Sequence, residues 1–112
     1  MSIGITVRVE MAPSLNTYIS GGNATTFYVS YTTTDTQQLV DPVNSALNYR
    51  NPPQNDTWTP LTLIQDSLGL YHADQQWEGF SGKIEIQALA QDASSNMLGA
   101  YQTSFWLNPW YA

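Results

Sequence analysis

The segment from residue 65 to residue 107 constrains the fold most strongly, because apolar and polar residues alternate there in short runs. Between residues 83 and 91, Ile or Ala occupies every second position, and the positions between them are mostly Lys, Glu or Gln. This period of two is typical of a strand with one buried face. Runs rich in Gly, Ser, Asp and Asn at 66–69, 79–82 and 92–96 supply turns. The segment therefore predicts three strands joined by turns.

The rest of the chain predicts four more strands. The full expected set is 3–11, 25–34, 43–50, 58–64, 70–77, 83–91 and 98–107. Residues 13–23 form a loop, within which 17–19 can add a short edge pairing. Pro60 has no N–H to donate to a ladder, which places its strand at a sheet edge. We therefore predict an all-β, antiparallel sandwich of about seven strands with Ig-like topology.

The same alternation predicts the core. The inward residues are expected to be Ile3, Ile5, Val7, Val9 and Met11; Phe27, Val29 and Tyr31; Val43, Leu47 and Tyr49; Ile84, Ile86, Ala88 and Ala90; and Tyr101, Thr103, Phe105 and Leu107. A chain of 112 residues suffices for one modest core, so we assign residues 1–112 to a single domain. A short aromatic tail at 108–112 follows the last strand.

Charge and cysteine content exclude several classes of function. Nine Asp or Glu residues face only three cations, giving a net charge of −6. Binding to nucleic acid or to an anionic membrane requires clustered cations, so we expect neither. The chain has no cysteine, hence no disulfide and no thiolate chemistry. The N-terminus lacks the pattern of a signal peptide, from which we expect synthesis and assembly in the cytoplasm.

The sequence offers little material for catalysis. His72 is the sole histidine, and the acid nearest to it on the same strand face is Asp74. One such pair without further catalytic groups is weak evidence for a general base. The other carboxylates are scattered over loops and outer faces, where solvation and turn capping account for them. We therefore expect no enzyme, no metal site and no cofactor.

The aromatic residues are the more informative set. Trp106 alternates with the inward Phe105 and should point outward, while Trp77 lies where a strand meets its turn. Aromatic rings exposed in this way can anchor an interface, although they can also pack over the open ends of a sandwich. The partner-binding residues that we predict are Trp106, Pro109, Trp110 and Tyr111, with Trp77 and Phe80 second.

Several short motifs resemble those of a known family. They are Val40-Asp41-Pro42, Asp66…Gly69-Leu70-Tyr71, Gly82-Lys83-Ile84 and Ala90-Gln91-Asp92…Asn96. Together they are similar to the small Ig-like modules of tailed-phage virions, which occur in capsid decoration (cement), head–tail and tail proteins. They are also similar to bacterial Ig-like repeats of surface adhesins. The resemblance implies no catalytic residues.

The expected function is that of a structural subunit of a phage particle that docks on capsid or tail neighbours. Its partners would be protein subunits of the virion, and whether copies also bind one another is left open. The alternative is a carbohydrate-binding or adhesin-like module that uses the same aromatic residues to bind glycans.

Overall fold

The computed structural model describes residues 4–12, 19–20, 24–52, 55–77 and 82–108. These residues form strands and connecting loops and contain no helix. The strands are β1 (Ile5–Ala12), β2 (Ile19–Ser20), β3 (Ala24–Thr33), β4 (Asn44–Asn51), β5 (Asn55–Leu61), β6 (Ile64–Ser67), β7 (Leu70–Gln76), β8 (Gly82–Gln91) and β9 (Met97–Asn108). The all-β prediction is confirmed.

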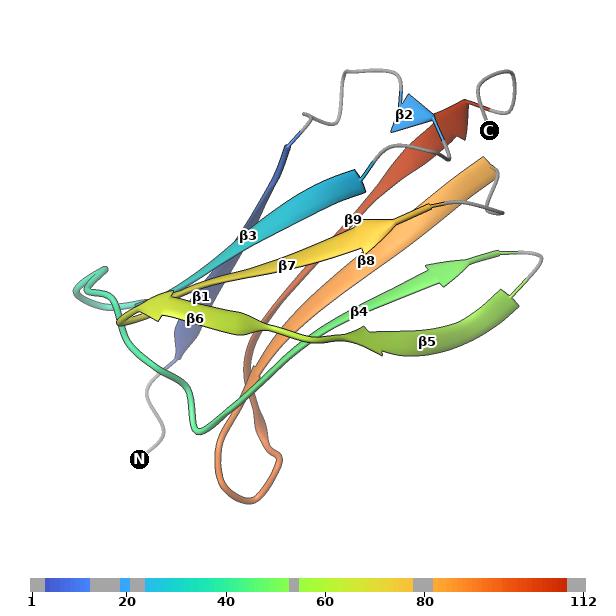
Figure 1. Cartoon of the computed structure of the whole chain (residues 1–112). Helices are drawn as coiled ribbons and strands as arrows, with labels where there is room; N and C mark the ends of the chain where they lie inside the picture. The colour runs from blue at the N-terminus through green and yellow to red at the C-terminus, as the bar shows by residue number, and fades with distance from the viewer. Residues whose placement is uncertain (1–3, 13–18, 21–23, 53–54, 78–81, 109–112) are drawn as a thin grey trace.

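Two sheets pack face to face (Figure 1). One sheet has the strand order β1-β3-β7-β6, and the other has the order β2-β9-β8-β4-β5. All neighbouring strands are antiparallel except the two-residue β2, which pairs in parallel with the end of β9. This order is that of an Ig-type sandwich, with the first strand in one sheet and a short continuation of it beside the last strand.

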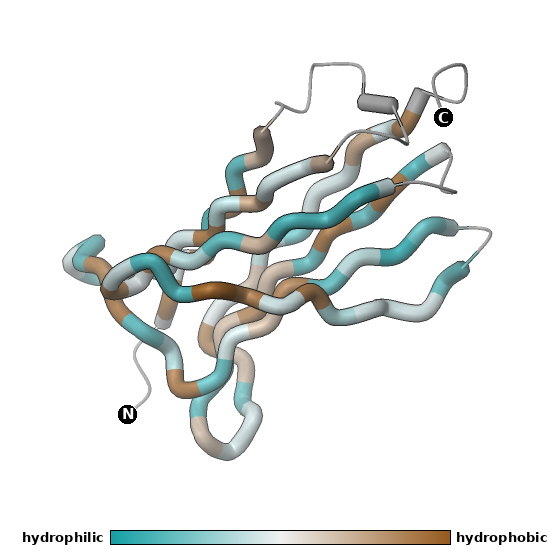
Figure 2. Tube along the Cα trace, viewed as in Figure 1, coloured by the Kyte–Doolittle hydropathy of each residue, from teal (hydrophilic) through white to brown (hydrophobic). Residues whose placement is uncertain are grey.

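Alternation along the strands puts one face of each sheet into a shared core. Apolar and polar residues alternate along β8 in Figure 2, and its four inward residues are completely buried. The buried apolar residues are Ile5, Val7, Phe27, Val29, Tyr31, Leu47, Ala73, Trp77, Ile84, Ile86, Ala88, Ala90, Phe105 and Leu107. Val9, Met11, Tyr49 and Tyr101 are partly buried against them. The inward faces predicted for β1, β3, β8 and β9 are therefore confirmed.

Aromatic rings gather around Trp77 at one end of this core. The centroid of the Trp77 ring lies 6.3 Å from that of Phe27, 5.6 Å from Phe105 and 5.3 Å from Tyr49, in each case edge to face. Its Nε1–H donates to Oγ1 of the buried Thr25 over 3.0 Å. The indole thus has both apolar contact and a hydrogen-bond partner, as a buried tryptophan requires.

Three expectations about the strands need correction. Val43 is 71% exposed because β4 begins only at Asn44, so Val43 lies before the alternating stretch. The strand expected at 58–64 is divided, since β5 ends at Leu61 and β6 begins at Ile64 in the other sheet. As a result the described residues hold eight longer strands and the short β2, rather than seven. The placement of Pro60 on an edge strand is confirmed.

The side chains of Asp41 and Asp92 stabilise two of the turns between strands through hydrogen bonds. One carboxylate oxygen of Asp41 accepts hydrogen bonds from the Gly69 N–H at 2.7 Å, from Gln65 at 2.9 Å and from the Tyr71 hydroxyl at 3.2 Å. The Gly69 N–H contributes most to holding the pKa of Asp41 below its ordinary value. Gly69 has φ of 72°, and a Cβ there would press on the backbone of Tyr31 and Val40, so the turn requires glycine.

The turn between β8 and β9 is also stabilised by an aspartate that accepts hydrogen bonds from N–H groups. The Asp92 carboxylate accepts from the backbone N–H groups of Asn96 and Ser94, both at 2.9 Å, and from the Asn96 side chain at 3.1 Å. The Asn96 backbone and side-chain donors chiefly lower the pKa of Asp92. The hairpin predicted at 92–96 is confirmed, and local hydrogen bonds account for its acidic residue.

Candidate partner-binding face

The structure separates the predicted partner-binding residues. Trp106 lies on β9 and is 68% exposed, which confirms the outward orientation inferred from its alternation with Phe105. Trp77 has no exposed surface, so its expected role as an exposed anchor is wrong: its ring completes the aromatic end of the core. Phe80, Pro109, Trp110 and Tyr111 lie outside the described residues. Trp106 is therefore the predicted contact from which a site can be built.

The register of the sheet gives Trp106 a charged neighbour. Trp106 pairs with Lys83 across β8 and β9, and paired residues share a sheet face. Two positions along β8, Glu85 faces the same way and pairs with Arg50 of β4. The outer face of this sheet therefore carries Lys83, Glu85 and Arg50 between its second and fourth strands.

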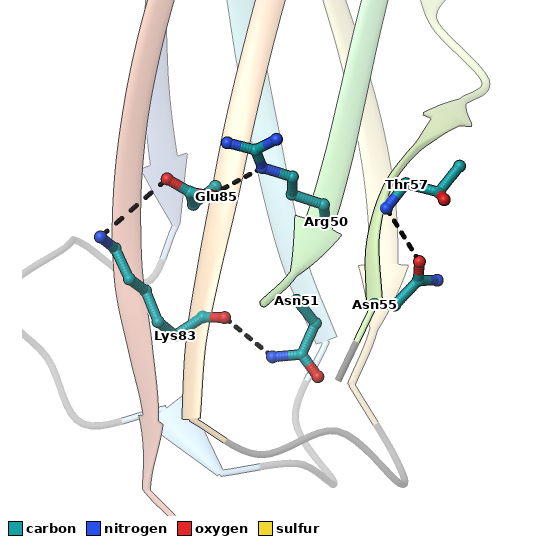
Figure 3. A network of polar contacts seen from close by, with 6 residues as sticks. All are labelled: Arg50, Asn51, Asn55, Thr57, Lys83 and Glu85. Atoms are coloured by element: carbon teal, nitrogen blue, oxygen red, sulfur yellow. Dashed lines mark hydrogen bonds and ion pairs between the residues drawn. The ribbon is translucent and has the colours of Figure 1, made fainter. Parts of the chain in front are cut away.

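One carboxylate ties these charges together, as Figure 3 shows. Glu85 Oε1 accepts from Arg50 Nε at 2.7 Å, and Glu85 Oε2 lies 4.0 Å from Lys83 Nζ. The guanidinium carbon of Arg50 lies 4.4 Å from the centroid of the Trp58 ring on β5, a cation–π contact. We call the set Trp58, Arg50, Glu85, Lys83 and Trp106 the tryptophan face.

Amide side chains fill the rest of the surface beside the tryptophan face. Asn48 donates from Nδ2 to Oε1 of Gln87 at 3.3 Å, and Gln87 pairs with Gln102 on β9. Below the charged row, the nearly buried Asn51 donates from Nδ2 to the backbone oxygen of Lys83 at 2.8 Å (Figure 3). That bond links the end of β4 to the start of β8 and so fixes the backbone that carries Lys83.

Sequence reasoning missed Trp58, Arg50 and Glu85 as members of this site. The outward orientation of Glu85 could have been inferred from the alternation along β8, in which it lies between the inward Ile84 and Ile86. The contact of Trp58 with Arg50 could not be inferred in this way, because β4 and β5 shift register between Tyr49 and Asn51. Such a shift changes which residues face the same side and leaves no simple mark in the sequence.

His72 contacts one carboxylate on the neighbouring strand. Nδ1 of His72 lies 2.8 and 2.9 Å from the two carboxylate oxygens of Asp66 on the neighbouring β6. Asp74, the expected partner, instead accepts from the Thr26 hydroxyl at 2.5 Å. Within the residues that the structure describes, no three His, Asp or Glu side chains gather as metal ligands would. The arrangement supplies an exposed contact between a histidine and a carboxylate beside β7.

The described part of the chain contains no helix long and apolar enough to cross a membrane. No family model matches the sequence, and no curated protein matches it significantly.

Proposed function

We propose that the domain is a non-enzymatic structural subunit of a tailed-phage particle, which docks on neighbouring capsid or tail subunits through the tryptophan face. The observation that supports the proposal most is the 68% exposure of Trp106 on a paired, regular strand next to Lys83. Large exposed aromatic residues with arginine nearby are typical of the residues that dominate protein interfaces. The phage particle as the setting comes from the resemblance of the turn motifs.

Docking of this kind works through a rigid surface. The sheet holds Trp106 and Trp58 in place before contact, so little conformational freedom is lost when a partner covers them. The carboxylate of Glu85 offsets one of the two positive charges of Arg50 and Lys83, which reduces the cost of removing water from the row. On a repeating lattice, several weak contacts add by avidity. Such a subunit would be assembled into the virion in the host cytoplasm.

The test is a binding assay with purified particles assembled without this chain. Added wild-type protein should bind saturably, and Trp106→Ala should weaken binding by about tenfold or more, as expected for a central aromatic contact. Val43→Ala is the matched control, because Val43 is equally exposed but lies outside the tryptophan face. Equal binding of Trp106→Ala and wild type would contradict the proposal.

A carbohydrate-binding module is the second candidate, and one observation favours it. The same sheet face bears the two indoles of Trp58 and Trp106 with the amides of Asn48, Gln87 and Gln102 nearby. Aromatic rings can stack on sugar rings while amides donate to and accept from hydroxyl groups. A polysaccharide array separates the two candidates: retention that is lost in both Trp58→Ala and Trp106→Ala, without binding to particles, would place carbohydrate binding first.

A further inference from the structure

The opposite face of the sandwich carries a groove that the tryptophan face does not explain. Two adjoining hollows of about 320 and 380 Å³ lie on the outer side of the β1-β3-β7-β6 sheet and share Ser30 and Leu70. We call this the β3 groove. The lining residues that matter here are Arg8 and Glu10 of β1, Tyr28 and Ser30 of β3, Asp66 of β6 and Leu70 of β7.

The sheet register explains why the surface is hollow there. Arg8, Ser30 and Leu70 form one cross-strand row, in which the small Ser30 lies between two long side chains. The next row contains Glu10, Tyr28, His72 and Ile64. Successive rows on one face lie about 7 Å apart along the strands. The groove therefore follows β3 over two to three rows, a length that suits a short extended peptide.

Apolar side chains concentrate around this groove. Of the eight large apolar residues that are exposed among the described ones, Tyr28, Leu39 and Leu70 line the groove, and two more, Ile64 and Leu68, lie on the same sheet or its β6–β7 turn. Scattered exposed apolar residues are ordinary, but a cluster at a hollow is typical of an interaction site. The tryptophan face accounts for none of these five.

Glu10 supplies a negative charge beside Tyr28. Glu10 pairs directly with Tyr28 on one side, at a strand spacing of about 5 Å. On the other side, both carboxylate oxygens of Asp66 already contact Nδ1 of His72, the partner of Tyr28 on β7. Arg8 lies one row farther along β1 and lines the second hollow, so it does not occupy the position over Tyr28.

We propose that the β3 groove binds an extended segment of a protein partner that presents a Lys or Arg side chain between apolar residues. The cation lies over the half-exposed Tyr28 ring beside Glu10, while apolar residues two positions away along the segment contact Leu70. Charge complementarity supports this occupant: the ring and Glu10 attract a cation, and the chain as a whole has a net charge of −6. A phosphate-bearing partner would be repelled at the same position.

This inference goes beyond the docking proposed for the tryptophan face. The two surfaces are the outer faces of opposite sheets, so one copy can contact two different neighbours at once. A subunit with two such surfaces can join parts of an assembly, whereas a single surface only attaches it. The inference does not depend on the identity of the partner at the tryptophan face.

The test uses the whole chain, labelled with 15N, and two acetylated and amidated pentapeptides, Val-Thr-Arg-Thr-Val and Val-Thr-Gln-Thr-Val, in which the two valines and the central residue point to the same side of the extended chain. The arginine peptide should shift amide signals around Glu10, Tyr28, Ser30 and Leu70, and the glutamine peptide should bind at least several-fold more weakly. Glu10→Gln and Tyr28→Ser should each weaken the arginine peptide about two- to fivefold. Equal shifts with both peptides, or shifts confined to the other sheet, would overturn the proposal.

Two controls keep this result separate from the proposed function. Trp106→Ala should leave peptide binding unchanged, so particle docking and peptide binding can fail independently. Ser30→Arg fills the groove and supplies a cation of its own, and it should abolish peptide binding while the folded spectrum persists. If sedimentation shows that copies of the chain associate and Ser30→Arg prevents it, the occupant is a second copy and the partner segment is excluded.

Discussion

The core around Trp77 and the outer face around Trp106 use the same side chain in opposite ways. Trp77 is enclosed by three aromatic rings and has a hydrogen-bond acceptor in Thr25, whereas Trp106, the cross-strand partner of Lys83, has most of its surface in water. The free energy from burying Trp77 is already part of folding, while that of Trp106 can still be gained on binding. A count of aromatic residues therefore says little about an interface until each ring is assigned to a face.

The largest expected effect is that of removing the buried ring. Trp77→Ala should lower the free energy of unfolding by about 3–5 kcal/mol, because it leaves a cavity among Phe27, Tyr49 and Phe105. Urea unfolding followed by far-UV circular dichroism measures the change. A loss below about 1 kcal/mol would mean that the aromatic end of the core repacks freely and that the contrast with Trp106 is weaker than described.

A second large effect is expected where the two sheets meet. A Cβ on Gly99 of β9 would overlap the carbonyl oxygen of Ile5 on β1, so Gly99→Ala should destabilise the domain by about 1–3 kcal/mol or more. Gly4→Ala is the matched control, because its nearest neighbour is the Thr34 hydroxyl at 3.1 Å, which can rotate away. Equal midpoints in urea for the two variants would show that β1 and β9 separate at little cost.

The hydrogen bond of the buried indole gives an intermediate effect. Thr25→Val keeps the shape but leaves the Trp77 Nε1–H without its Thr25 acceptor, which should cost about 1–3 kcal/mol. Thr25→Ser retains a hydroxyl and should lose less. Thermal unfolding of the two variants side by side measures the difference. The prediction fails if the serine variant is the less stable of the pair.

The core also carries a pH dependence. Burial raises the pKa of Tyr31 to about 12 from 10.0, with a smaller lowering by Ser45 and a small raising by Tyr71. The unfolded chain releases this proton near pH 10 and the folded chain near pH 12. Stability from neutral Tyr31 is therefore complete below pH 10 and is lost as the pH rises through 12.

Tyr31→Phe tests this dependence, because phenylalanine does not ionise in either state. Its urea midpoint should fall less steeply than that of wild type between pH 10 and pH 12. Near neutral pH the change should be about 1 kcal/mol, since the Tyr31 hydroxyl makes a long 3.4 Å bond to the Leu89 oxygen and a side-chain hydrogen bond with Ser45. Parallel curves for the two proteins across the alkaline range would argue against burial as the cause of the raised pKa.

The smallest effect on stability is expected for the exposed indole. Trp106→Ala should change the free energy of unfolding by no more than about 0.5 kcal/mol, as is usual for a surface position. The same variant is expected to lose docking, so the two measurements together separate folding from binding. A destabilisation comparable to that of Trp77→Ala would show that Trp106 packs on the domain itself.

Alternation predicted the strands and their buried faces well, because the residues that define the buried face of one strand are close together in the sequence. It placed Ile84 and Phe105 correctly, and it set Trp106 outward. Alternation also indicates that Trp77 is buried, because Trp77 is an even number of residues from the buried Ala73 and faces the same side. The prediction that Trp77 is exposed was based on its position next to a turn and is wrong. At the end of a strand, the alternation of inward and outward positions therefore predicts burial better than closeness to a turn does.

The parts that sequence reasoning could not supply depend on contacts between distant segments. The division into β5 and β6 moves the chain from one sheet to the other within two residues, and the register shift at Tyr49 brings Trp58 to Arg50. The β3 groove depends on Ser30 having Arg8 and Leu70 as row neighbours, a fact of register between three strands. Turn residues and periodicity do not encode these pairings.

The path of the first and last strands has a mechanical consequence. β1 begins at Ile5 at one end of the sandwich and β9 finishes at Asn108 at the other, so a pull between them runs along the strands (Figure 1). The β1–β3 hydrogen bonds lie across that direction and must yield together in shear, whereas a sideways pull would open them one after another. A part built in this way resists tension along its length much better than across it.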